Sequence, residues 1–160
     1  MSFPDVGHRG TQRLRRIWAL FVAPVVVAIA IVAIGLLPPS NETTTWFAVI
    51  VVSAAVVDFA GVFWIRRVGG EAILSLDSNN EIRDAYLRRM VLACAFAVAP
   101  ALLAFAFVFA AGTTEVFYIV ALASLALLAY AGPRSADIEE LDDRMVGAGR
   151  SFRVSAALDS

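Results

Sequence analysis

Four long stretches of this chain carry almost no charge, and they constrain the fold more than any other feature. They lie at residues 17–37, 46–65, 90–111 and 116–131. A bilayer core needs roughly 20 consecutive apolar residues to be crossed by a helix. A β-barrel would instead show alternating segments of about ten residues. The sequence therefore predicts an all-α membrane protein with four transmembrane helices.

The composition agrees with a membrane protein and not with a soluble domain. Hydrophobic residues make up 60% of the chain and charged residues 17%, whereas soluble domains contain about 45–50% and about 25%. The first stretch is longer than the apolar core of a signal peptide, about 7–15 residues. Pro38-Pro39 follows it in place of a cleavage site. We therefore interpret this stretch as a membrane helix.

The charged segments divide the chain into a polar arm, a membrane bundle and an acidic tail, at residues 1–16, 17–132 and 133–160. The bundle is expected to contain two hairpins, at residues 17–65 and 90–131. A cytoplasmic linker at residues 66–89 would join them. Gly69-Gly70 is expected to end the second helix, because glycine disfavours helical conformation. The turn 77–80 is expected to cap the third helix.

The tail contains five acidic residues between Pro133 and Arg144. Ser135 is expected to cap a short helix there, with acids in its first turn favoured by the helix dipole. We interpret the tail as a solvated, partly disordered segment. The alternative is a docking motif for a basic partner.

All thirteen basic residues are arginine, and their distribution orients the chain. Four precede the first apolar stretch, five lie in the linker and four follow the last stretch, whereas the two remaining loops contain none. Because basic residues concentrate on the cytoplasmic side, we predict a multi-pass protein of the cell (plasma) membrane with both termini in the cytoplasm. The arginines expected to flank the bilayer and to contact anionic lipid head groups are Arg15, Arg16, Arg66, Arg67, Arg88 and Arg89.

Aromatic side chains are expected at both membrane boundaries, where amphipathic rings prefer to lie. Trp18, Trp64 and Tyr86 would mark the cytoplasmic boundary. The outer boundary would be marked by Trp46, Phe117 and Tyr118. The net charge of −1 gives no general attraction to polyanions, so the expected partners are the lipid bilayer and other membrane chains, and not nucleic acid.

The first and third helices share a pattern that indicates an internal duplication. Leu-Arg-Arg precedes each helix, at 14–16 and 87–89, and Val-Ala-Pro recurs at 22–24 and 98–100. The two hairpins would be parallel repeats, because an even number of helices separates them. Each repeat carries a proline inside its first helix, Pro24 or Pro100, and we expect a kink at both.

Small residues favour close packing of the helices. Ala93, Ala97, Ala101 and Ala104 fall on one face of the third helix, and Ser53 and Gly61 offer flat positions on the second. Small residues let helix backbones approach closely in lipid, where packing drives association. We therefore expect a compact bundle with the third helix at its centre.

Asp58 is the only charged residue deep inside an apolar stretch. Charged residues in a membrane span usually face the bundle interior and mark a functional position. Burial favours the neutral form of a carboxyl, so Asp58 is a candidate to exchange a proton or ion. The other interpretation is a structural anchor, bonded to a hydroxyl such as that of Ser53 or to Arg88 or Arg89.

A short motif in the second hairpin consists of a tyrosine, then Ala-Pro-Ala-Leu, a glycine turn and a final proline, here at Tyr86, 99–102, Gly112 and Pro133. In this motif the segment resembles a family of small, uncharacterised bacterial four-helix membrane proteins, which is grouped loosely with the proteolipid (c) subunit of rotary ATP synthases. The resemblance implies a four-helix membrane fold. The family's glutamate position is occupied by Val98 and its arginine position by Ala93, so the proton-carrying group is missing from this hairpin.

The chain departs from two better-defined groups. It lacks the glycine repeat of a true c subunit, and its hairpin loops are predicted to face outward where that subunit's loop faces the cytoplasm. Small multidrug transporters carry a glutamate in the first helix, whereas the first apolar stretch here has no charge.

No residue pattern typical of a catalytic, metal-binding or cofactor-binding site is present. Cys94 is the only cysteine and His8 the only histidine. We therefore expect no enzyme, no metal and no cofactor. The sequence favours a helix-packing subunit that assembles with itself or with other membrane proteins. The alternative is a small proton- or ion-coupled, proteolipid-like transport component that uses Asp58.

Overall fold

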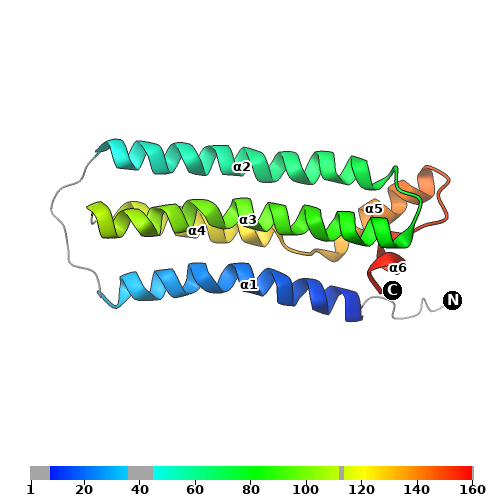
Figure 1. Ribbon diagram of the computed structural model, residues 1–160, viewed down its shortest axis with the longest axis horizontal. Helices are drawn as coiled ribbons and strands as arrows, with labels where there is room; N and C mark the ends of the chain where they lie inside the picture. Colours follow the sequence, from blue (N-terminus) through cyan, green and yellow to red (C-terminus); the bar gives the residue numbers. More distant parts are fainter. Residues whose placement is uncertain (1–7, 36–44, 112–113, 160) are drawn as a thin grey trace.

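The computed structural model describes residues 8–35, 45–111 and 114–159, and these contain helices and no strand. The six helices are α1 (His8–Ala33), α2 (Thr45–Ile73), α3 (Asn79–Ala111), α4 (Thr114–Ala131), α5 (Ser135–Gly147) and α6 (Val154–Asp159) (Figure 1). The helices α1 to α4 are long and apolar enough to cross a membrane. The predicted all-α membrane fold with four spanning helices is therefore confirmed. The predicted glycine turn at Gly112 and the side chain of Trp46 lie outside the described residues.

The helix α3 lies at the centre of the bundle, as predicted. It contacts α1, α2, α4 and the short helix α6. Ala93, Ala97, Ala101 and Ala104 are all buried, so the alanine face of α3 is covered by its neighbours. Small side chains here let the surrounding backbones approach α3 closely.

The two sequence hairpins pack differently. The helices α3 and α4 lie side by side, whereas α1 and α2 lie on opposite sides of α3 (Figure 1). The α3–α4 pair thus lies between two outer helices, and each outer helix contacts both members of that pair. Pro24 and Pro100 lie inside α1 and α3, which continue through both. The duplication and the two kinks stay predictions.

Two glycines mark close contacts between helices. A Cβ at Gly61 of α2 would lie 3.0 Å from Cδ1 of Phe96 on α3. A Cβ at Gly132 would lie 2.9 Å from Nε1 of Trp18 on α1. That same indole nitrogen donates a hydrogen bond to the carbonyl of Leu128 at 2.8 Å. Backbone contact of this kind is what holds helices together in lipid.

The helices extend beyond the apolar stretches into the predicted linker 66–89 and, from His8 onward, into the predicted arm 1–16. The helix α2 continues to Ile73, α3 begins at Asn79, and α1 already begins at His8. Gly69-Gly70 does not end α2. The absence of a side chain at Gly69 lets Arg89 pack closely against the helix, because a Cβ there would lie 3.1 Å from Cγ and Cδ of Arg89. The predicted cap of α3 is confirmed, since the hydroxyl of Ser78 accepts a hydrogen bond from the backbone N–H of Glu81 at 3.2 Å.

The acidic tail is folded, so the prediction of a solvated, partly disordered segment is wrong. It packs at the arginine-rich end of the bundle, by which we mean the end where α2 stops and α3 starts (Figure 1). Five of its apolar residues are buried: Ile138, Leu141, Met145, Val154 and Ala157. Arg150 donates a hydrogen bond to Asp77 in the α2–α3 connection.

The caps of the two tail helices differ from the prediction for Ser135. The N-cap of α5 is Arg134, without a side-chain hydrogen bond, and Ser135 is the first helical residue. The carboxylate of Asp142 instead caps α6, because it accepts a hydrogen bond from the backbone N–H of Val154 at 2.5 Å and from the hydroxyl of Ser155.

Candidate functional site

Asp58 lies in the middle of α2, and none of the residues that the structure describes bonds to its side chain. It is half-buried and sits one turn from Gly61, which packs on Phe96 of α3. Because Gly61 lies against Phe96 and Gly69 against Arg89, the antiparallel register places Asp58 level with Pro100. Its carboxylate makes no hydrogen bond or ion pair with another residue in the described part of the chain.

The partners predicted for an anchoring role of Asp58 are engaged elsewhere or turned away. Ser53 and Arg88 are exposed, and Arg89 pairs with Asp137 of α5. The sequence therefore identified the residue, but the interaction expected for a structural anchor is not formed within the described bundle.

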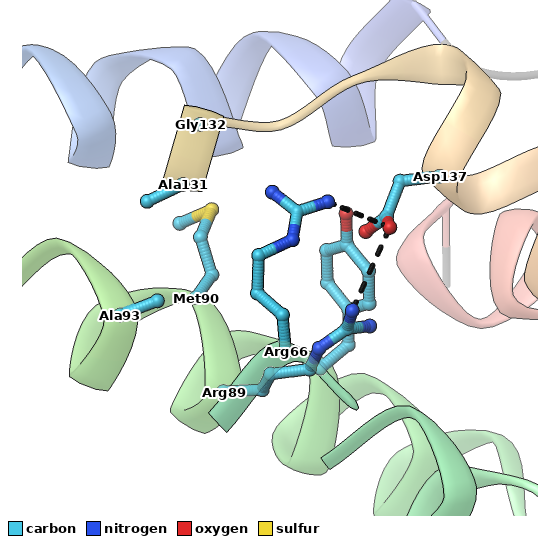
Figure 2. Close-up of a pocket in the computed structure, with 8 residues that line it drawn as sticks. Arg66, Arg89, Met90, Ala93, Ala131, Gly132 and Asp137 are labelled. Atoms are coloured by element: carbon cyan, nitrogen blue, oxygen red, sulfur yellow. Dashed lines mark hydrogen bonds and ion pairs between the residues drawn. The ribbon is translucent and has the colours of Figure 1, made fainter. Parts of the chain in front are cut away.

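A buried ionic cluster joins three helices at the arginine-rich end. Asp137 of α5 is contacted at Oδ1 by Nη2 of Arg66 from α2 at 2.7 Å and by Nη2 of Arg89 from α3 at 3.5 Å (Figure 2). The three side chains are only 12%, 9% and 18% exposed for Arg66, Arg89 and Asp137. One carboxylate thus faces two guanidinium groups.

The ionic cluster is tied further into α4. Arg66 also donates to the carbonyl of Tyr130, and its guanidinium carbon lies 4.6 Å from the centroid of the Tyr130 ring. The second terminal nitrogen of the Arg89 guanidinium, Nη1, is buried and has no hydrogen-bond partner among the described residues. Positive charge therefore exceeds negative charge inside the cluster.

The six flanking arginines predicted from the sequence separate into two groups. Arg66 and Arg89 turn inward and pair with Asp137, so their predicted role as lipid-facing flanks is replaced by an ionic contact. The exposed ones are Arg15, Arg16, Arg67 and Arg88. Asp137 was not singled out from the sequence. The spacing of Ile138, Leu141 and Met145 could have identified this helix, because it places one apolar stripe on α5. Such a stripe predicts that the helix packs against the bundle.

Two cavities lie beside the ionic cluster. A small one of about 10 Å³, large enough for one water molecule, is lined by Arg66, Tyr86, Arg89, Met90, Ala93, Ala131, Gly132 and Asp137 (Figure 2). A larger groove of about 630 Å³ opens between α2, α3, α4 and α5. Asp58 lines neither cavity.

No three His, Cys, Asp or Glu side chains gather as a metal site would require, within residues 8–35, 45–111 and 114–159. Cys94 is buried inside the bundle. Comparison of the chain with protein-family models, curated proteins and solved structures found no match. The resemblance to bacterial four-helix proteins stays a hypothesis.

Proposed function

We propose that this multi-pass protein resides in the bacterial plasma membrane, with both termini in the cytoplasm, and acts as a non-enzymatic assembly subunit. In this proposal α2 packs against a second membrane chain, either another copy or a different protein. The observation that carries it is the carboxylate of Asp58, which lies in the middle of an apolar helix and has no partner among the described residues.

The energetic cost of that carboxylate supports the proposal. An aspartate at the centre of a membrane helix costs about 2.5–3.5 kcal/mol on insertion scales. The bundle itself does not offset this cost, because no described side chain bonds to Asp58. A polar or basic group on a second chain would offset it. The residues around Asp58 give such a chain an apolar surface, since Val56, Val57 and Phe59 are exposed.

The orientation makes a first prediction. A reporter that is active only outside the cytoplasm should be active when it is fused at Thr44 or Thr113. A reporter that is active only in the cytoplasm should be active when it is fused at the carboxyl end. The arginine distribution is the reason, because every arginine lies outside those two loops. An inward-facing reporter at Thr44 would overturn the predicted orientation.

The assembly role makes a second prediction. Wild-type protein, extracted in mild detergent, should appear by native mass spectrometry as an oligomer or with a co-purifying membrane protein. Asp58→Ala should weaken that association by about 5- to 30-fold, because a polar contact between membrane helices contributes roughly 1–2 kcal/mol. The matched control is Ser53→Ala, an exposed polar residue of the same helix, which should leave the association unchanged.

The outcome that contradicts this proposal is a strictly monomeric wild-type chain without a co-purifying protein. The alternative function, a proton- or ion-coupled transport component, has its own readout. Labelling of Asp58 by dicyclohexylcarbodiimide, with loss of pH-driven flux in Asp58→Asn proteoliposomes, would favour transport over assembly. Cross-linking through the native Cys94 is not a suitable test, because that thiol is buried.

A further inference from the structure

The groove at the arginine-rich end is lined by an excess of positive charge. Of its thirteen lining residues, five are arginines and three are acids. The arginines are Arg66, Arg67, Arg89, Arg134 and Arg144, and the acids are Glu71, Asp137 and Glu140. They come from α2, α3 and α5 and from the α4–α5 connection, so the groove depends on the folded tail.

The acids leave several guanidinium groups with unused donors. Asp137 forms ion pairs with both Arg66 and Arg89, and Glu140 forms an ion pair with Arg144. Arg67 makes no ion pair or hydrogen bond within the part of the chain that the structure describes. Arg134 donates one hydrogen bond, to the carbonyl of Ala129 at 3.1 Å.

Arg89 adds a further unpaired guanidinium nitrogen beside the groove. Its side chain is only 9% exposed, yet its Nη1 has no hydrogen-bond partner in the described residues. This nitrogen lies beside the groove, 3.9 Å from the position of a Cβ at Gly70, which also lines it. A buried unpartnered guanidinium nitrogen is costly unless an acceptor reaches it.

The position of the groove defines the kind of anion. Arg66 and Arg67 directly follow the apolar part of α2, and the groove is bordered on that side by Phe63, which is 54% exposed, and by Tyr130. One end of the groove therefore meets the acyl-chain region and the other meets the guanidinium groups. Arginine binds phosphate oxygens through paired N–H donors.

We propose that this groove binds the phosphate head group of an anionic phospholipid from the leaflet at the arginine-rich end. The phosphate lies between Arg67 and Arg134, and the acyl chains lie along Phe63. The unpaired positive charge at Arg89 also attracts the anionic head group. This site is distinct from the surface around Asp58 and does not depend on the assembly role. Basic pockets between membrane helices are a known way to hold such lipids.

The test compares two double variants of the full-length chain. Arg67→Gln with Arg134→Gln removes two groove arginines, whereas Arg15→Gln with Arg16→Gln removes two exposed arginines of α1 outside the groove. Native mass spectrometry in mild detergent measures retention of added phosphatidylglycerol, with phosphatidylcholine as the uncharged comparison. Circular dichroism confirms that each variant is folded, and the single variant Arg67→Gln serves if the groove double variant is not.

The groove double variant should retain phosphatidylglycerol about 10- to 30-fold less well than wild type, because each of the two arginines that contact the bound phosphate contributes roughly fivefold. The α1 double variant should change retention less than about threefold. Equal losses in both variants would overturn the proposal, because they would indicate general attraction to the arginine flanks. Displacement of the lipid by an equal concentration of inorganic phosphate would also overturn it, in favour of a site for free phosphate.

Discussion

Asp137→Ala should lower the free energy of unfolding by about 3 kcal/mol. The substitution leaves the guanidinium groups of Arg66 and Arg89 without their counter-charge, in surroundings where these side chains are 12% and 9% exposed. An uncompensated buried charge is far more costly than the pair is stabilising. Equilibrium unfolding of the detergent-solubilised protein with sodium dodecyl sulfate, followed by circular dichroism, measures the change.

Two comparisons make the Asp137 result specific. Asp143→Ala removes an exposed acid from the same helix and should change stability by less than about 0.5 kcal/mol. A triple variant, Arg66→Met with Arg89→Met and Asp137→Leu, should recover most of the loss, because apolar side chains of similar size replace the whole cluster. If Asp137→Ala and Asp143→Ala behaved alike, the ionic cluster would contribute little to folding.

Phe117→Ala should lower the free energy of unfolding by about 2–4 kcal/mol. The ring is fully buried between helices and lies 5.8 Å, centroid to centroid, from the ring of Phe105 on α3. Its removal leaves a cavity at the α3–α4 contact, and the lost van der Waals contacts are not replaced by lipid. The same unfolding titration measures the effect.

The matched control for Phe117 is Ile119→Ala. Ile119 lies two residues further along α4 and is 69% exposed, so it faces away from the bundle. In a membrane the surrounding acyl chains solvate this position in either variant, and the change should stay below about 1 kcal/mol. A comparable loss at both positions would argue that α4 is buried on all sides.

The existence of the four long helices was predictable because it depends on composition averaged over about 20 residues. The central position of α3 was predictable for a related reason, because the alanine face follows from the spacing of residues within one helix. Phe117 shows the limit of this approach. Its place near the end of a span favoured a membrane-boundary aromatic, whereas the structure buries it completely. Which face of a short segment packs depends on neighbours that the segment does not specify.

The features missed by the sequence all involve distant contacts. Gly69-Gly70 looks like a helix break until Arg89 is known to lie against it. The acidic tail looks solvated until Arg66 is known to pair with Asp137, 71 residues away. In both cases a tertiary contact overrides a local preference. Asp58 is intermediate: the sequence identified the charge, but only the packing of α2 on α3 shows that no described residue bonds to it.

The separation of α1 and α2 by α3 has a consequence for biosynthesis. A chain emerging from the ribosome delivers α1 and α2 first, yet each of these helices packs chiefly on α3 and α4. Because α1 and α2 share no extensive interface in the part of the chain that the structure describes, we expect them to enter the bilayer as independent segments. Tertiary folding starts only when the third helix is inserted and moves between them. The ionic cluster forms last, because Asp137 follows all four membrane helices in the order of synthesis.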